Sequence, residues 1–474
     1  MYRPAAALYK NRAGITDYSG GFMKRERVKD ILVSTILLCT GTFIGCGGTS
    51  SDAPVAGWPD VNGDGYADLA VVEGMYGFDS GDGSTDPRIH VYYGGKAAVS
   101  EPANQIISLT EIEGNLETQV MEDFNDDGYA DLAVSDGDFV YIFNGGASGL
   151  SSTPDTTITV ANNSLCAGDF NGDGIMDLAM GNTGYSSGRG GVLFYYSSGT
   201  GGLSTLADLT LTGTNTGDFF GASLATGDIN GDGYTDLAVS ASGINSMAGQ
   251  VSLFYGSDTG ISTTAGTTLN GETSADYFGS TMVTGDFNHD GFADLVVAAV
   301  FYDATSPAIT NCGRVYIFHG TSTGITTDAA ADRAITGSSD YYALGMTMST
   351  GDVNDDGYAD LALGANVYGG GGTSDRRGVV YIHNGSNSGV SATASWTKTG
   401  ENESTGGDTD YFGSIVYLSD LSGDGRADLY VLAQGCPWET PDAEYIGRAY
   451  WFRSTRSGMA SSASWQLDAY FYAY

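Results

Sequence analysis

The chain has 474 residues, enough for one large repeat-built domain or about three ordinary domains. Its 57 Asp and Glu residues outnumber 19 Lys and Arg residues, and the formal net charge is −38 at pH 7. Because such a surface repels phosphate backbones and anionic membrane faces, the composition excludes nucleic-acid binding and favours a protein that meets cations.

The N-terminal region has the pattern of an export signal. Residues 1–22 precede a better start at Met23, and we interpret them as a non-native extension. Residues 23–45 combine a basic start with an apolar run, 31–44, that is too short for a comfortable membrane span. The run ends at Gly45-Cys46, which resembles a bacterial lipobox. We therefore expect a lipoprotein-type signal peptide, lipidation of Cys46 and a flexible linker over residues 46–54.

This N-terminus predicts an exported bacterial protein, held at the outer membrane or cell surface through a lipid on Cys46. Phe43 stands where such motifs usually have Leu, so a plain secretory signal or a short membrane anchor is the alternative, with a periplasmic or secreted product. The lipid on Cys46 is the only membrane contact that we expect. Beyond it, Cys166, Cys312 and Cys436 form no metal or redox motif.

Residues 55–474 contain one acidic segment in seven copies, roughly every 60 residues, which is the mark of a repeat architecture. We call the copies loops 1 to 7; they begin at Asp60, Asp123, Asp169, Asp228, Asp286, Asp352 and Asp420. Loop 4, for example, reads DINGDGYTD. Each copy has oxygen-bearing side chains at positions 1, 3, 5 and 9 and a Gly at position 6.

This spacing predicts calcium binding, because Ca²⁺ takes six to eight oxygen ligands from a tight loop. Position 7 would add its backbone carbonyl, which leaves its side chain free to vary. Up to seven Ca²⁺ ions are expected. The predicted ligands, loop by loop, are Asp60, Asn62, Asp64, Tyr66, Asp68; Asp123, Asn125, Asp127, Tyr129, Asp131; Asp169, Asn171, Asp173, Ile175, Asp177; Asp228, Asn230, Asp232, Tyr234, Asp236; Asp286, Asn288, Asp290, Phe292, Asp294; Asp352, Asn354, Asp356, Tyr358, Asp360; and Asp420, Ser422, Asp424, Arg426, Asp428.

Two other structures are the alternatives for these loops. Acidic turns held by Asx hydrogen bonds alone would use the same residue types. An EF-hand would need a bidentate Glu at position 12 and flanking helices, but position 12 is apolar in every copy and lies within a strand-like run such as Leu237-Ala-Val. We therefore expect each loop to be a hairpin tip between two strands, with a metal ion holding the hairpin. Ser422 makes loop 7 the weakest copy.

Other features keep the same period. Aromatic–Gly pairs precede several loops, as at Phe220-Gly221, Phe278-Gly279 and Phe412-Gly413, and β-rich runs ending in Gly follow them. Four short strands fill each repeat, so we predict an all-β fold, a seven-bladed β-propeller of four-stranded antiparallel blades over residues 55–474. The combination resembles the FG-GAP repeat family, known from the head of integrin α subunits. The resemblance implies a propeller whose loops bind Ca²⁺.

Ring closure also has a sequence hint. The chain ends DAYFYAY, which is similar to the start of another repeat, whereas the first repeat has only a short, Pro-interrupted lead-in. We expect residues 468–474 to complete the first blade as its closing strand.

The meander places the metal loops on one face and long, aromatic-bearing loops on the other. The candidate ligand-binding residues on that opposite face are Tyr302, Tyr368, Arg376, Arg377 and Trp438. Aromatic side chains beside small polar ones suit contact with a protein or a sugar. We expect a monomeric, calcium-stabilised propeller that binds or adheres to an extracellular protein or glycan.

We do not expect an enzyme. The sequence has four His residues and no Ser/His/Asp, Cys/His or phosphate-loop pattern, and calcium accounts for the acidic clusters. A secreted hydrolase or lyase with its site at the propeller axis is the alternative from another class. A structural component of an envelope assembly is the third interpretation.

Overall fold

The structure is a computed structural model in which the chain divides into two compact units, Met1–Thr40 and Gly41–Tyr474. The residues that it describes are 59–73, 88–95, 103–109, 118–161, 164–327, 330–365, 377–400, 411–433 and 444–472, and all of them lie in the second unit. Every structural statement below concerns these residues.

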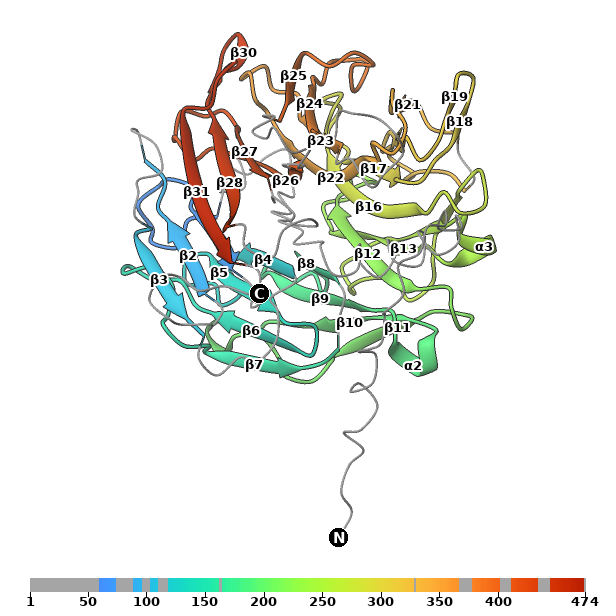
Figure 1. The fold of residues 1–474 in the computed structure, drawn as a ribbon. Coiled ribbons are helices and arrows are strands. Elements are labelled where there is room, and N and C mark those ends of the chain that lie inside the picture. Colours follow the sequence, from blue (N-terminus) through green and yellow to red (C-terminus); the bar gives the residue numbers. More distant parts are fainter. Residues whose placement is uncertain are drawn as a thin grey trace, which may run out of the picture. The chain divides into compact units, whose positions relative to one another are not determined.

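The described strands form seven antiparallel sheets of three or four strands, arranged radially as the blades of a β-propeller (Figure 1). In chain order the blades are β1 (Leu69–Glu73), β2 (Arg88–Tyr92), β3 (Gln105–Ser108); β4 (Thr118–Glu122), β5 (Asp131–Ser135), β6 (Phe139–Phe143), β7 (Thr156–Thr159); β8 (Ser164–Gly168), β9 (Asp177–Asn182), β10 (Gly191–Tyr195), β11 (Leu209–Thr212); β12 (Phe220–Gly227), β13 (Asp236–Ala241), β14 (Gln250–Phe254), β15 (Thr267–Asn270); β16 (Phe278–Gly285), β17 (Asp294–Ala299), β20 (Arg314–Phe318), β21 (Arg333–Thr336); β22 (Leu344–Gly351), β23 (Asp360–Ala365), β24 (Val379–His383), β25 (Trp396–Thr399); and β26 (Phe412–Ser419), β27 (Asp428–Ala433), β28 (Glu444–Phe452), β31 (Trp465–Tyr472). The predicted all-β, seven-bladed fold is confirmed.

Short elements decorate the blades. Two small hairpins and three single turns complete the described structure: β18 (Ala304–Thr305) with β19 (Ala308–Ile309), β29 (Ser454–Thr455) with β30 (Gly458–Met459), α2 (Tyr185–Gly188), α3 (Ile244–Met247) and η1 (Gly199–Gly201). Within the described residues there is no helix with the length and apolarity needed to cross a membrane.

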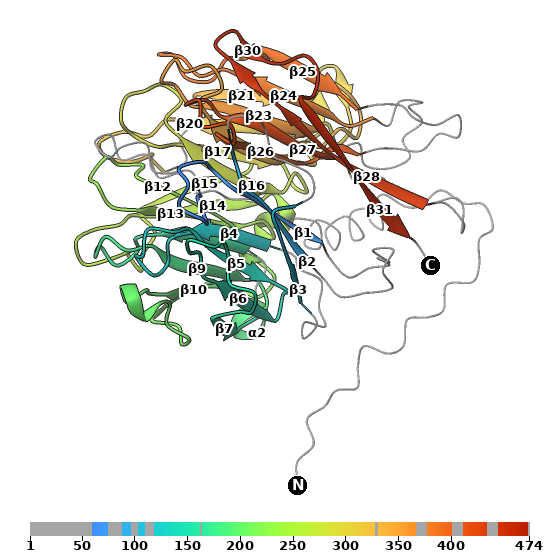
Figure 2. The same ribbon diagram turned by 90° about the vertical axis from the view of Figure 1, so that its left-hand side faces the viewer.

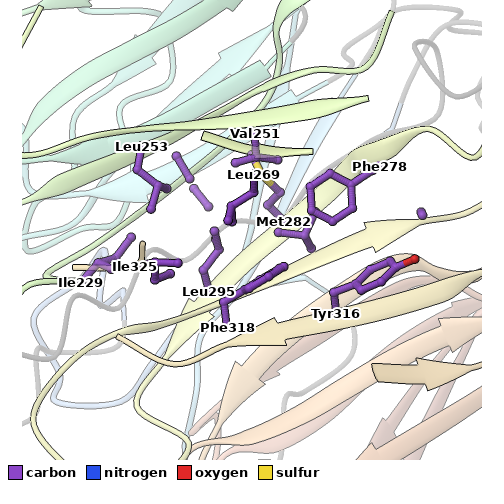
Figure 3. Packing of buried hydrophobic residues seen from close by; sticks show 14 residues of the cluster. Ile229, Val251, Leu253, Leu269, Phe278, Met282, Leu295, Tyr316, Phe318 and Ile325 are labelled. Carbon is purple, nitrogen blue, oxygen red and sulfur yellow. The ribbon is translucent and has the colours of Figure 1, made fainter. Parts of the chain in front are cut away.

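Burial follows the position of each strand within its blade. Second strands such as β13 and β17 are buried at every residue, because neighbouring blades cover both of their faces, and their sequences are accordingly apolar throughout. Outer strands such as β7 alternate between exposed and buried side chains. The core therefore lies between blades, as Figure 3 illustrates for the fourth and fifth, where Val251 and Leu253 face Met282 and Leu295.

The Phe-Gly pairs mark a bulge at the start of the inner strand. Phe278 pairs with Ala299, and the register then shifts before Met282. Gly279 in between has φ of +87°, a conformation that favours Gly. Phe278 is 2% exposed and packs edge-on against Tyr316 and Phe318. The aromatic residue of the pair is thus a core residue rather than a surface contact.

The predicted closing strand is wrong. Residues 468–472 continue β31, which pairs with β28 as the outer strand of the seventh blade, with Asp468 opposite Arg448 and Tyr472 opposite Glu444. The first blade has three described strands, β1 to β3. Both β28 and β31 are long, at nine and eight residues against five and four for β24 and β25, and they extend beyond their neighbours (Figure 2). The added length of β28 gives residues 468–472 a strand to pair with in the seventh blade.

The ring joins by packing between its first and seventh blades. Ala67, Leu69 and Tyr92 share one buried cluster with Tyr430 and Trp451. The Gly95 N–H also donates to the Leu421 carbonyl across the junction, at 3.0 Å. Side-chain packing and backbone hydrogen bonds, rather than an exchanged strand, therefore connect these two blades.

Candidate metal centres

Loops 2 to 7 each lie between the first and second strands of their blade, as predicted, and loop 1 precedes β1, the first described strand of its blade. Loop 4 connects β12 to β13, whose ladder begins at the pair Gly227 and Asp236. In the first blade the same rung is present, because the Asp68 N–H donates to the Pro59 carbonyl at 2.7 Å. Since every blade runs in the same sense around the ring, the loops are brought to one face of the propeller.

The position-1 aspartate shapes the loop by accepting backbone hydrogen bonds. In loop 4 the carboxylate of Asp228 accepts the N–H groups of Gly231 at 2.6 Å, Asp232 at 3.1 Å and Gly233 at 2.8 Å. Asn230 Oδ1 accepts the Asp232 N–H at 2.9 Å, and the Asp232 carboxylate accepts that of Tyr234 at 3.1 Å. Asx turns of this kind are present, and they hold the oxygen-bearing side chains on the inside of the turn.

The position-9 aspartate also links its loop to the third strand, a role that the sequence did not reveal. Asp236 is 0% exposed; its Oδ2 accepts the Ile229 N–H at 2.9 Å, and its Oδ1 accepts the Gly256 N–H at 2.8 Å. It therefore ties the start of its loop to the end of the third strand, 20 residues away. The equivalent aspartates of the other loops are also 0% exposed: Asp68, Asp131, Asp177, Asp294, Asp360 and Asp428.

The residue that donates to the position-9 aspartate after the third strand is glycine in five blades and serine, Ser197 or Ser454, in the third and seventh. A Cβ on Gly256 would lie 2.4 Å from the Thr235 carbonyl oxygen, and one on Gly385 would lie 2.2 Å from that of Ala359. In these two blades the glycine that ends the β-rich run thus allows the backbone to approach the acidic loop closely.

Burial makes the charged form of these aspartates unfavourable unless a cation is bound. Burial raises the pKa of Asp236 to about 7; hydrogen bonds from Gly256 and Ile229 oppose the shift, and the charges of Asp232 and Asp228 add to it. The same cause raises the pKa of the other position-9 aspartates to about 7, to about 8 for Asp294 and to about 6 for Asp428.

The donor set fits a hard cation. Every predicted ligand offers oxygen, and each of loops 1 to 6 has aspartate at positions 1, 5 and 9, so these three side chains bring a charge of about −3 that one Ca²⁺ would reduce to about −1. In loop 6 the position-3 Asn354 Oδ1 is buried and has no hydrogen-bond partner. As the described side chains stand, no three His, Cys, Asp or Glu residues are close enough together to hold a metal ion, so the aspartates of a loop would have to move closer to one another to bind one.

Backbone hydrogen bonds link several successive loops. In loops 2, 5, 6 and 7 the position-8 N–H donates to the position-1 carbonyl of the loop before it, as Ala293 does to Asp228 at 2.8 Å and Ala427 does to Asp352 at 2.7 Å. Position 4 also meets the position-7 side chain of the next loop. A Cβ on Gly231 would lie 2.4 Å from the Phe292 ring, so only a residue without a side chain fits there.

On the opposite face, Tyr302 belongs to a built contact rather than a free surface. The Arg314 guanidinium lies 4.7 Å from the centre of the Tyr302 ring, and its Nη1 donates to the Tyr302 hydroxyl at 2.8 Å and to Glu272 at 3.2 Å. Arg377 is half-buried just before β24. The other predicted ligand-face residues, Tyr368, Arg376 and Trp438, lie outside the described residues, as does Cys46.

Comparison with known proteins agrees with this repeat structure. A family model described as "FG-GAP repeat" matches residues 161–196, 220–254, 278–318 and 344–383, which coincide with the first three strands of the third to sixth blades. The chain carries an integrin alpha-like FG-GAP propeller. The family resemblance read from the Phe-Gly pairs and acidic loops is thereby confirmed.

The FG-GAP propeller is similar to parts of larger proteins. It is 33% identical to integrin alpha-5 of Xenopus laevis over 221 residues, which cover 46% of this chain and 20% of that protein. It is 34% identical to integrin alpha-V of Gallus gallus over 218 residues, covering 43% and 20%. It is 33% identical to phosphatidylinositol-glycan-specific phospholipase D of Bos taurus over 171 residues, covering 34% and 20%. The chain thus matches about a fifth of the length of these relatives.

Proposed function

We propose that this FG-GAP propeller is a calcium-stabilised binding or adhesion module that recognises an extracellular protein or glycan. One observation carries the calcium part of the proposal. The position-9 carboxyl group of every loop is fully buried, and in loops 1 to 6 the charges of two other aspartates of the same loop raise its pKa further. In loops 1 to 5 no described basic side chain pairs with any of these three aspartates. Buried carboxylates need a cation or a proton, and at neutral pH a hard divalent ion suits an all-oxygen site.

Both side chains and backbone of each loop would bind that ion. The side chains at positions 1, 3, 5 and 9 and the backbone carbonyl at position 7 would be its ligands. Calcium would supply charge neutralisation and no redox or acid–base chemistry. The chain itself provides the rest: the position-9 aspartate joins the loop to the third strand, and in loops 2, 5, 6 and 7 the position-8 N–H joins it to the preceding blade. Metal binding would therefore stabilise each blade and its contact with the next.

The calcium part is tested by comparing the full chain in calcium and in chelator. Isothermal titration should give a stoichiometry of several ions per chain, and thermal unfolding should occur at a markedly higher temperature with calcium than with EGTA. Magnesium at the same concentration is the control, because its strict octahedral geometry suits these loops poorly. An unfolding temperature that is equal in calcium and in EGTA would refute this part.

The binding part is supported by the named relatives and by the arrangement of the faces. The propeller matches integrin alpha-5 and integrin alpha-V over more than 200 residues each. Because the metal loops occupy one face, the opposite face carries the longer connections. Tyr302 and Arg377 lie there, and we propose that Tyr368, Arg376 and Trp438 join them as ligand contacts.

A protein and glycan array, run with calcium and with chelator, tests this binding. Arg377→Ala should weaken saturable binding at least tenfold, whereas Arg333→Ala on the outer strand β21 should leave it unchanged. Circular dichroism would show that both variants fold. Saturable binding that is equally strong in both variants would place the contact elsewhere and remove this face from the proposal.

A secreted hydrolase or lyase is the second candidate, and one observation favours it. The propeller is 33% identical over 171 residues to a phosphatidylinositol-glycan-specific phospholipase D, although it spans only 20% of that enzyme. A screen of phospholipids and polysaccharides with the purified chain tests this candidate. Turnover without saturable binding would replace the adhesion proposal.

Export and a lipid anchor at Cys46 also belong to the proposal, as does a monomeric state. Mass spectrometry of the protein purified from a bacterial envelope would detect a diacylated N-terminal Cys46, and light scattering would give the oligomeric state. Pull-down of the full chain from the same envelope would reveal the third candidate, a structural component of a larger assembly.

A further inference from the structure

Loop 7 differs from the other loops in the basic side chains that lie beside its position-5 aspartate. Arg426, at position 7, places its Nη2 2.5 Å from Asp424 Oδ2, and Arg453 Nη2 lies 3.3 Å from the same oxygen. The Arg426 side chain is 15% exposed and that of Asp424 is 20% exposed, so this pair is largely shielded from water. In loop 4 the equivalent Asp232 has no basic partner; its Oδ2 accepts Asn230 Nδ2 at 3.0 Å.

Two arginines change the electrostatics that a calcium ion would meet. Asp420, Asp424 and Asp428 bring a charge of about −3, and Arg426 and Arg453 reduce it to about −1. The other loops would reach that value only after taking up Ca²⁺. One Asp424 oxygen is also occupied by the two guanidinium groups. The attraction that would draw a divalent cation into loop 7 is therefore largely cancelled by the chain itself.

The remaining oxygens of loop 7 are still in place. Asp424 Oδ1 and Asp428 Oδ2 are buried without a hydrogen-bond partner. Ser422 Oγ is also buried and forms no hydrogen bond of normal geometry, although it lies close enough to Asp428 to lower the pKa of that carboxyl group. Loop 7 thus keeps a ligand set but has lost the charge that gives such a set its affinity.

We infer that loop 7 is a calcium-independent copy, whose arginines take the place of the ion and weaken its calcium affinity at least about 100-fold relative to loops 1 to 6. This inference rests on the proposed calcium binding by the other loops. Loop 7 lies at the junction of the first and seventh blades: a Cβ on Gly423 would lie 2.3 Å from the Tyr66 ring. The junction that joins the two ends of the propeller would then keep its shape when calcium is scarce.

Hydrogen exchange of the full chain, with and without calcium, tests the inference loop by loop. Peptides covering residues 228–236 should gain protection on calcium addition, whereas those covering 420–428 should change little. Titration of the wild type should give six tight sites. The double variant Arg426→Tyr/Arg453→Asn installs the residues found at the equivalent positions of the second and sixth blades, where Tyr lies in the loop and Asn follows the third strand. It should add a seventh site and calcium-dependent protection of 420–428.

Tyr234→Arg in loop 4 is the reciprocal control, and it should remove protection of 228–236 while the remaining loops still respond. Equal protection of loops 4 and 7 in the wild type would overturn the inference and leave the proposed calcium binding intact. A double variant that folds, as judged by circular dichroism, but gains no seventh site would also overturn it. If no loop responds to calcium, the proposed function fails, and the inference fails with it.

Discussion

Replacing Asp236 tests the double role of the position-9 aspartate. Its carboxylate accepts the buried N–H groups of Ile229 at 2.9 Å and Gly256 at 2.8 Å. Asp236→Ala leaves both donors without a partner, at about 1–3 kcal/mol each. We therefore expect the free energy of unfolding to fall by about 3–5 kcal/mol, whether or not calcium is present, with a further loss in calcium.

Asp236→Asn separates the hydrogen bonds from the charge. The amide oxygen can keep one N–H bond, while the buried charge, costly in a group whose pKa is raised to about 7, is removed. We expect this variant to lose more stability in calcium than in EGTA, because only the calcium-bound loop uses the charge. Asp258→Asn removes an exposed aspartate of the same blade and should have no effect in either condition.

Urea unfolding followed by tryptophan fluorescence, in calcium and in EGTA, measures all three variants. The reasoning is refuted if Asp236→Ala unfolds at the same urea concentration as the wild type. It is also refuted if Asp236→Asn loses the same stability in both conditions, since the carboxylate would then have no part in cation binding.

Three further predictions concern the pH dependence, a close backbone approach and the core. In EGTA, the free energy of unfolding should fall as the pH rises from about 4 to about 7. Burial keeps the position-9 carboxyl groups protonated in the folded state at pH values where the unfolded chain has already lost those protons. Urea unfolding midpoints across this range check the sign, and a midpoint that rises with pH would contradict it. Gly256→Ala should cost about 2–4 kcal/mol in urea unfolding, because its Cβ would lie 2.4 Å from the Thr235 carbonyl oxygen, and a loss below about 1 kcal/mol would contradict the close approach. Phe278→Ala should cost about 3–5 kcal/mol in thermal unfolding, and Phe139→Ala, on a partly exposed ring, much less.

Local patterns predicted the blades because each repeat carries its own signals. The Asp-x-Asn-x-Asp-Gly spacing of loop 4, followed at once by the apolar run Leu237-Ala-Val, indicates a tight turn and a buried strand without reference to the rest of the chain. The structure has the strand β13 there, buried at all six residues. The Phe-Gly pairs recur with the same period as the loops, although only the structure shows that they begin the inner strand.

Contacts between distant residues could not be read from the sequence. The bond from Gly256 to Asp236 spans 20 residues, and the contact of Arg453 with Asp424 spans 29. The chain end was misassigned for the same reason. Residues 432–447 have the composition of a loop, so nothing indicated that β28 begins at Glu444 and offers a pairing partner as far as Tyr472.

The side-chain contact between neighbouring loops restricts how the repeats can change. A glycine at position 4 of loop 4 leaves room for the Phe292 ring of loop 5, and His289 of loop 5 packs edge-on against Tyr358 of loop 6, with ring centres 5.7 Å apart. Each repeat contributes one residue to the contact with the preceding loop and another to the contact with the following loop. A repeat moved to another place in the ring would therefore meet different partner residues on both sides. The copies look interchangeable when aligned, yet each is fitted to its own neighbours, so substitutions at these positions should be tolerated in pairs more readily than singly.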